Sequence, residues 1–134
     1  MISPQPETSK VSLDTELRNA AAKLRILTMP VAEQHPGPWN VHNPNGYPQA
    51  VFSPAADVIL CETLDEIDAP KPTAPYIAAM QPGVALALAE LLDIEATVVA
   101  ARIAEDGTDD YAADVGTDHL LTIARLINGE EAAR

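Results

Sequence analysis

The chain has 134 residues and a formal net charge of −12, from 20 acidic and 8 basic side chains. This length supports one modest hydrophobic core. The negative charge repels nucleic-acid phosphates and anionic lipid surfaces. Composition therefore disfavours direct binding to nucleic acid or membranes.

The hydrophobic fraction is 47% but the aromatic fraction is only 4%, so the core is predicted to consist mainly of aliphatic side chains, as helices permit. A lone cysteine, Cys61, cannot form an internal disulfide, which fits a reducing compartment. The sequence shows neither a basic-then-apolar leader nor an apolar run of about 18 residues. We therefore expect a cytoplasmic protein without a membrane segment.

The first residues, 1–11, carry two prolines without hydrophobic periodicity and are predicted to form a flexible tail. From Ser12, apolar residues recur at three- and four-residue steps, which predicts an amphipathic helix that ends before Pro30. The apolar positions are Leu13, Leu17, Ala20, Leu24 and Leu27. The outer face of this helix forms a basic strip of Arg18, Lys23 and Arg25.

Short apolar runs separated by turn formers predict a three-stranded antiparallel meander over 39–42, 49–52 and 57–62. Asn45-Gly46 is expected to supply the positive backbone torsions of a tight turn. Pro48 favours an edge position for the second strand. A loop over 62–72 then leads to the second helical region.

The second half of the chain is predicted to be helical. Thr73 is expected to cap a short helix over 76–80, followed by a long helix over 82–104. Thr117 is expected to cap a final helix that stops at Gly129, and residues 130–134 are expected to fray. The predicted class is α+β, with a single domain over 12–129.

Two apolar faces distinguish the long helix. At 100° per residue one face holds Ala87, Leu91, Ile94 and Val98, and the other holds Leu88, Leu92, Val99 and Ile103. A helix that is apolar on two sides is either central in its own domain or shared with a partner subunit. We favour a homodimer, and the sequence alone does not identify the interface.

Two charged residues, Glu95 and Arg102, lie between these apolar faces, so their desolvation would require partners. They are two turns apart, about 10 Å along the axis, which strains a contact within one helix. Antiparallel pairing across a dimer would join them, and extension of both side chains to solvent is the alternative. The expected interaction residues are Leu91, Ile94, Glu95, Val98 and Arg102.

Carboxylates at Glu90 and Asp93 lie one turn apart and could share a divalent cation. The pattern is similar to the paired acidic motifs of all-α nucleotide pyrophosphohydrolases. The best upstream match, Glu62 with Asp65, precedes several prolines and lacks a helical scaffold. A metal-dependent nucleotide hydrolase is therefore an alternative, and a solvated helix face is favoured, with no catalytic or metal residue assigned.

The sequence does not indicate a zinc site or a phosphate-binding loop. The histidines His35, His42 and His119 are scattered, and no Cys/His spacing fits zinc. No glycine-rich phosphate loop occurs, so no cofactor is expected. The basic strip or Arg102 could serve a nucleotide-sequestering protein, which is a further alternative.

The chain resembles small accessory proteins of actinobacterial phages and prophages, similar to the Ead-type proteins of lambda-like phages. The resemblance lies in His35-Pro36-Gly37-Pro38-Trp39 and in the run from Tyr76 through Pro82 to Asp93, within residues 13–128. The chain has His35 where that pattern has Thr, and Thr73-Ala74-Pro75 where it has an Asp-Ala-Ala-like helix start. The resemblance implies a phage-related, non-structural protein of the host cytoplasm and transfers no catalytic residue.

These features together predict a non-catalytic accessory protein that binds a host or phage protein. One form of such a protein is an inhibitor that binds a defence or replication enzyme by imitating nucleic acid with its acidic surface. The acidic segments 57–68 and 105–118 suggest this form.

Overall fold

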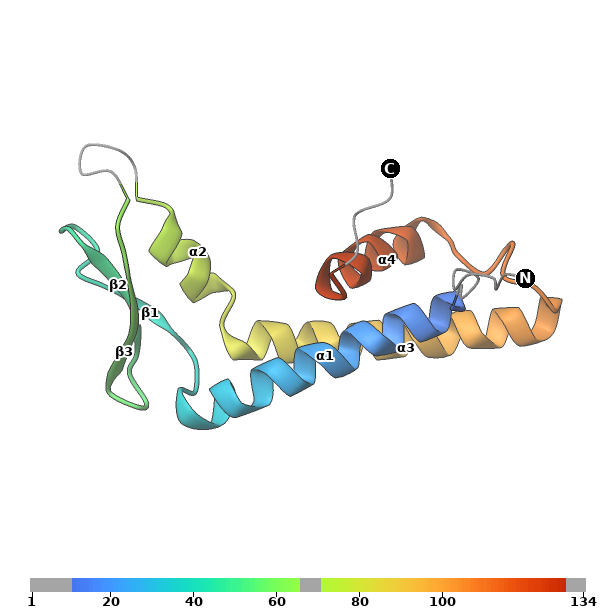
Figure 1. The fold of residues 1–134 in the computed structure, drawn as a ribbon, viewed down its shortest axis with the longest axis horizontal. Coiled ribbons are helices and arrows are strands. Elements are labelled where there is room, and N and C mark those ends of the chain that lie inside the picture. Colours follow the sequence, from blue (N-terminus) through green and yellow to red (C-terminus); the bar gives the residue numbers. More distant parts are fainter. Residues whose placement is uncertain (1–10, 66–70, 130–134) are drawn as a thin grey trace, which may run out of the picture. The chain divides into compact units, whose positions relative to one another are not determined.

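The computed structural model describes residues 11–65 and 71–129 (Figure 1). Its elements are, in order, α1 (Leu13–Gln34), β1 (Asn40–His42), β2 (Gln49–Ser53), β3 (Val58–Thr63), α2 (Thr73–Ala79), α3 (Pro82–Asp106) and α4 (Val115–Ile127). The predicted α+β class is confirmed. Residues 1–10 of the predicted tail, residues 66–70 of the predicted loop and the fraying end predicted over 130–134 lie outside the described residues.

The chain divides into two compact units. The helical unit comprises Met1–Lys23 and Ala89–Arg134, and the sheet unit comprises Leu24–Leu88. Both boundaries between them fall inside helices, one in α1 and one in α3. The single domain expected over 12–129 therefore stays a prediction, since α1 and α3 each run through both units.

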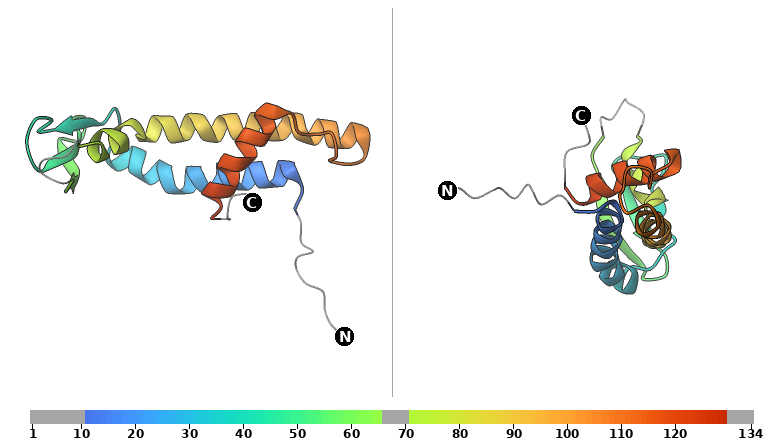
Figure 2. Two further views of the ribbon diagram at one scale, coloured as in Figure 1. Left: turned by 90° about the horizontal axis from the view of Figure 1, so that it is seen from above. Right: turned by 90° about the vertical axis from the view of Figure 1, so that its right-hand side faces the viewer.

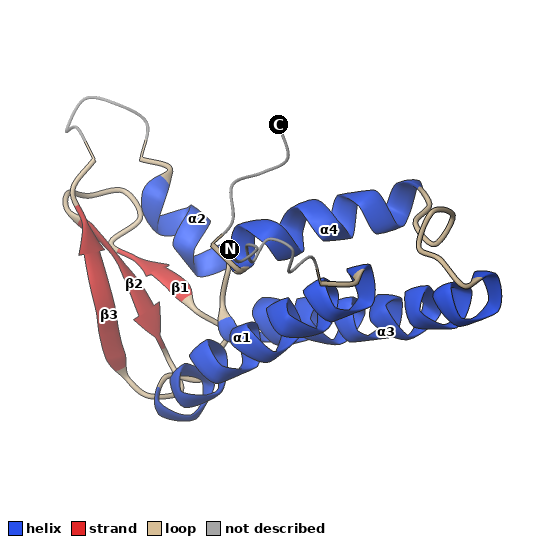
Figure 3. Ribbon diagram, turned by 45° about the vertical axis from the view of Figure 1, so that its right-hand side comes forward, coloured by secondary structure: helices blue, strands red, loops and turns tan. Residues whose placement is uncertain are grey.

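The sheet unit contains an antiparallel meander with strand order β1-β2-β3 (Figure 3). The three predicted strands are confirmed, but the edge position expected for the second strand is wrong, because β2 is central. It begins at Gln49, one residue after Pro48. The missing amide hydrogen of Pro48 therefore costs the strand ladder nothing.

The turn between β1 and β2 uses a different residue from the one predicted. The left-handed conformation belongs to Asn43, with φ 60°, rather than to Asn45 or Gly46. Asn43 tolerates this conformation because its short amide hydrogen-bonds locally: Nδ2 donates to the Pro48 carbonyl at 3.0 Å. The Gly46 amide closes the turn by donating to the Asn43 carbonyl at 3.1 Å.

The core of the sheet unit lies between α2 and the sheet, which contact each other along all three strands (Figure 3). Its buried centre is Val51, Ala74 and Ala78. Partly buried side chains pack around this centre, among them Trp39, Val41, Leu60, Cys61 and Ile77. Small alanines on α2 allow the helix to approach the sheet closely, which suits a chain with few aromatic residues.

Helix α1 continues past Pro30 to Gln34, so its predicted end is wrong. A proline inside a helix removes one backbone hydrogen bond. The last turn is held in other ways: the His35 amide donates to the Val31 carbonyl at 2.7 Å. The indole Nε1 of Trp39 donates to the His35 carbonyl at 2.8 Å, which satisfies an acceptor at the helix end.

The predicted caps, Thr73 and Thr117, are both inside their helices. Aspartates supply the accepting oxygens instead: Asp65 accepts from the Thr73 amide at 3.3 Å and from its hydroxyl at 2.6 Å. Asp114 accepts from the Thr117 amide at 2.8 Å. A carboxylate is favoured at these positions because its charge also interacts with the positive end of the helix dipole.

In the helical unit, α4 begins beside α3 and ends beside the start of α1 (Figure 2). Arg125 near the end of α4 forms a two-point ion pair with Glu16, with Nε to Oε1 at 2.7 Å and Nη2 to Oε2 at 3.0 Å. The fully buried larger side chains of this unit are Leu17, Leu92, Val99 and Thr117. Gly129, with φ 84°, follows α4 as the predicted stop.

Candidate interaction face and ligand pocket

The two apolar faces of α3 have different environments. Leu92 and Val99 are fully buried, whereas Leu91, Ile94 and Val98 are 46%, 56% and 37% exposed. The exposed residues are spaced at three and four positions, so they share one side of the helix. We call this set, Leu91, Ile94 and Val98, the α3 face. The structure thus distinguishes two faces that the sequence left equivalent.

Glu95 and Arg102, the two charged residues expected at the interface, have partners inside the helical unit. The Thr117 hydroxyl donates to the Glu95 carboxylate, joining α3 to the start of α4. Arg102 Nη1 donates to the Ala112 carbonyl at 3.0 Å, and Nη2 lies 3.6 Å from the Asp114 carboxylate. The desolvation of both charges is therefore offset within one chain, so neither requires a second subunit.

The acidic candidates for metal binding occur in different settings. Glu90 is exposed and Asp93 half-buried on α3. Asp65 holds the first turn of α2 through Thr73. Among residues 11–65 and 71–129, no three His, Cys, Asp or Glu side chains are grouped so that they could hold a metal ion. Metal binding by Glu90 and Asp93 stays a prediction.

Two aspartates of the helical unit have lowered pKa values. The hydrogen bond from the Thr117 amide holds the pKa of Asp114 below 3.8, and the charge of Arg102 acts in the same direction. For Asp14, burial raises the pKa, but hydrogen bonds from Ser12 and Arg18 outweigh it, so the net shift is downward. Both carboxylates are thus stabilised in the charged form by local contacts.

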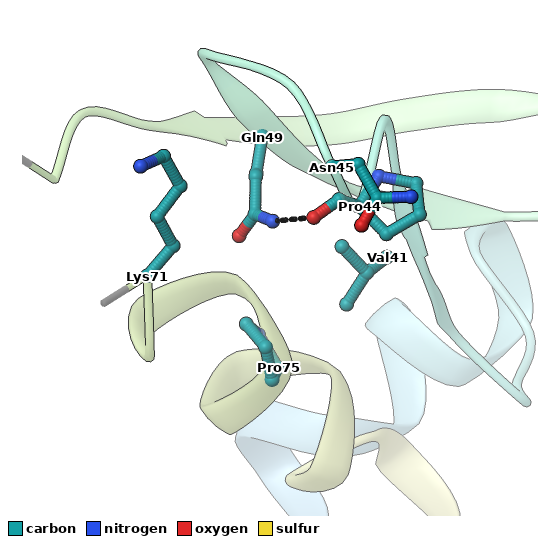
Figure 4. Close-up of a pocket in the computed structure, with 6 residues that line it drawn as sticks. All are labelled: Val41, Pro44, Asn45, Gln49, Lys71 and Pro75. Atoms are coloured by element: carbon teal, nitrogen blue, oxygen red, sulfur yellow. Dashed lines mark hydrogen bonds between the residues drawn. The ribbon is translucent and has the colours of Figure 1, made fainter. Parts of the chain in front are cut away.

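The sheet unit contains a pocket of about 420 Å³ between the β1–β2 turn, the sheet and the start of α2 (Figure 4). Six residues line it: Val41, Pro44, Asn45, Gln49, Lys71 and Pro75. Its volume falls within the range of about 300–1,000 Å³ that is typical of small-molecule sites. Three of these residues, Val41, Pro44 and Pro75, are aliphatic, and the other three carry polar groups.

Gln49 is the most buried of the polar residues that line this pocket, at 5% exposed. Its Nε2 donates to the Pro44 carbonyl. Its Oε1 is buried and accepts no hydrogen bond from any described residue, and Figure 4 shows it directed into the space between Lys71 and Pro75. The pocket therefore contains a buried acceptor that can receive one more hydrogen bond.

A cation lies near the rim of the same pocket. The Lys71 ammonium stands 5.9 Å from the centre of the Tyr47 ring, a distance at which the ring face attracts a positive charge. The pocket thus combines an inner acceptor, aliphatic walls and an outer positive charge.

Sequence reasoning did not identify the pocket residues. The turn formers around Pro44 and Asn45 were recognised as a turn, but no local pattern singles out Gln49. Its position follows from β2 being central and from α2 lying against the sheet. Lys71 lies between two prolines of a loop, and only the fold brings it to Gln49.

Comparison with protein-family models, with curated proteins and with solved structures finds no match. Within the described part of the chain, no helix combines the length and the apolar character needed to cross a membrane.

Proposed function

We propose that the chain is a non-catalytic binding protein that self-associates through the α3 face. The observation that carries this proposal is the exposure of Leu91, Ile94 and Val98 on one side of α3. Contiguous exposed apolar residues favour protein contacts. A second copy is a suitable occupant, because two such helices can pair antiparallel with the same residues on both sides.

The resemblance to phage accessory proteins supports a role in the cytoplasm of an infected host, where the dimer would engage a host or phage protein. The charge of −12 supports the form of this role in which an acidic surface is presented to a basic partner. Contact with such a partner would weaken as salt rises. Self-association through the α3 face would strengthen with salt, because salt screens the repulsion between two acidic chains.

The test is sedimentation velocity of the full chain over a range of concentrations, comparing Ile94→Lys with Thr97→Lys. Both substitutions place a lysine four residues after an acid, Glu90 or Asp93, so their effects on the helix are matched. Only Ile94 belongs to the α3 face; Thr97 lies about 60° away from it around the helix.

We expect the wild-type chain to form dimers whose affinity rises with salt. Ile94→Lys should weaken dimerisation by at least about tenfold, because it removes a buried isoleucine from each side of the interface. Thr97→Lys should leave dimerisation unchanged. A wild-type chain that stays monomeric at hundreds of micromolar, or equal effects of both lysines, would contradict the proposal.

A further inference from the structure

We infer that the pocket beside Gln49 binds a small planar molecule that presents an N–H donor to Gln49 Oε1 and a single negative charge to Lys71. This site lies wholly in the sheet unit, whereas the α3 face lies wholly in the helical unit. Ligand binding and self-association are therefore independent proposals, and either can fail without the other.

The N–H donor is specified by the amide of Gln49. The bond from Nε2 to the Pro44 carbonyl fixes which way this amide faces, because the reverse orientation would place two acceptors against each other. Oε1 is then left as a buried acceptor without a partner among the described residues. A buried acceptor without a partner is unfavourable, and a ligand N–H would supply the missing hydrogen bond.

We expect the ligand to be planar because of the residues that line the pocket. Val41, Pro44 and Pro75 present aliphatic surface around the inner acceptor (Figure 4). Proline rings offer flat C–H surfaces on which an aromatic or imide ring can lie. A cavity of about 420 Å³ accommodates one such ring with a short substituent.

We expect the ligand to carry one negative charge, because Lys71 is positive whereas the chain as a whole is negative. The Lys71 ammonium lies at the rim near Tyr47 and would attract an anion. The chain as a whole carries −12, so a multiply charged anion would be repelled more strongly than a singly charged one. The amide of Asn45 also lines the pocket and can donate to a ligand carbonyl.

Three small probes separate these requirements. Orotate is a planar imide with one carboxylate, uracil is the same ring without the charge, and benzoate has a ring and a carboxylate but no N–H donor. Each is titrated into the full ¹⁵N-labelled chain, and amide resonances are followed by NMR. The reporters are the Gln49 side-chain amide and the backbone amides of Val41, Asn45 and Lys71.

We expect orotate to bind most tightly, uracil more weakly and benzoate most weakly, with the largest shifts at the Gln49 side chain. Lys71→Met should reduce the affinity for orotate to that for uracil, while uracil binding stays unchanged. Lys23→Met is the matched control: it removes an equal charge from an exposed position of α1, outside the pocket, and should leave orotate binding unchanged.

Gln49→Met should weaken orotate binding by about tenfold, because the ligand N–H would lose its acceptor. Since Gln49 also holds the β1–β2 turn, this variant could fail to fold, and the probe series on the wild-type chain tests the same requirement without a mutation. Equal binding of benzoate and orotate would show that the site takes any carboxylate and would overturn the inference. Absence of shifts at the Gln49 side chain with all three probes would overturn it as well.

Discussion

The helical unit and the sheet unit use their polar side chains in different ways. In the helical unit, charged and hydroxyl groups bond to one another across elements: Glu16 to Arg125, and Glu95 to Thr117. In the sheet unit, polar side chains bond mainly to backbone carbonyls of nearby loops, as Ser53 does to Pro36 at 2.8 Å. One pattern ties helices together, whereas the other fixes loop conformation.

A second difference concerns polar atoms left over after folding. The buried side-chain atoms without a hydrogen-bond partner in the described chain are His35 Nδ1 and Gln49 Oε1, and both belong to the sheet unit. The helical unit has an exposed apolar face, which is suited to association. The sheet unit has a buried acceptor without a hydrogen-bond partner beside a pocket, which is suited to ligand binding. The two proposed activities therefore fall in different units.

The largest expected effect tests whether the two units unfold together. Leu92→Ala, at a fully buried position of α3, should lower the free energy of unfolding by about 2–5 kcal/mol through loss of buried surface and creation of a cavity. Urea unfolding is followed by far-UV circular dichroism and by the fluorescence of Trp39, the only tryptophan, which lies in the sheet unit.

We expect both signals to give one midpoint in this experiment, because α1 and α3 continue through both units. Separate midpoints for Trp39 fluorescence and for circular dichroism would show that the units unfold independently. Leu91→Ala is the control at the neighbouring, exposed position, and in the monomer it should cost less than about 1 kcal/mol.

The ion pair of the helical unit is expected to have the next largest effect. Arg125 and Glu16 are 29% and 12% exposed, so removing the guanidinium leaves a mostly buried carboxylate without its partner. Arg125→Met should cost about 1–3 kcal/mol in urea unfolding. Arg18→Met removes a pair within one helix, with Asp14 at 2.6 Å, and should cost about 0.5 kcal/mol or less because Arg18 is 47% exposed. Equal losses of stability in Arg125→Met and Arg18→Met would contradict the expected difference between the two ion pairs.

A smaller effect is expected from the loop contacts of the sheet unit. Ser53 is fully buried, and Ser53→Ala should cost about 1 kcal/mol by leaving the Pro36 carbonyl without its donor. The change is measured by urea unfolding monitored at Trp39. Thr122→Ala, which removes an exposed hydroxyl-to-carbonyl bond within α4, should be close to neutral. A neutral Ser53→Ala would mean that the loop does not depend on this bond.

The smallest effect concerns acid stability, to which two aspartates of the helical unit are expected to contribute. Because the pKa values of Asp14 and Asp114 are lowered on folding from 3.8, their contribution is fully present above that value. It is lost as the pH falls through the lower, folded-state pKa values, where the carboxylates become protonated. Asp114→Asn keeps a capping oxygen but removes this titration.

We therefore expect Asp114→Asn to change the melting temperature little at pH 7 and to make it fall less steeply than in the wild-type chain below pH 4. Thermal unfolding monitored by circular dichroism between pH 7 and pH 3 measures both. An identical acid slope in the two chains would show that Asp114 does not contribute to acid stability.

The elements of the fold were largely predictable because their signals are local. Apolar spacing identified α1 and α3, short apolar runs between turn formers identified the three strands, and Gly129 marked the end of α4. The errors concern which nearby group completes a helix end. Trp39 and Val31 contribute to the last turn of α1, which continues past Pro30. Asp114 is the N-cap of α4, and Asp65 accepts from the first residue of α2, where the threonines were expected to act.

The candidate sites were predictable only in part. The set Leu91, Ile94 and Val98 follows from helical periodicity, but its exposure depends on which side of α3 the rest of the helical unit covers. Glu95 and Arg102 were recognised as charges in need of partners, and the partners proved to lie in α4 and in the loop before it. No pattern in the sequence points to Gln49, because an isolated glutamine carries no periodic signal.

By itself, the sequence determined the α+β class, the order of elements and the two apolar faces of α3, since each depends on residues a few positions apart. Only the tertiary structure decided which of those faces is buried, that Glu16 pairs with Arg125 across 109 positions, and that Gln49 and Lys71 share one pocket. Contacts of this range arise from the packing of whole elements. Spacing along the chain cannot specify them.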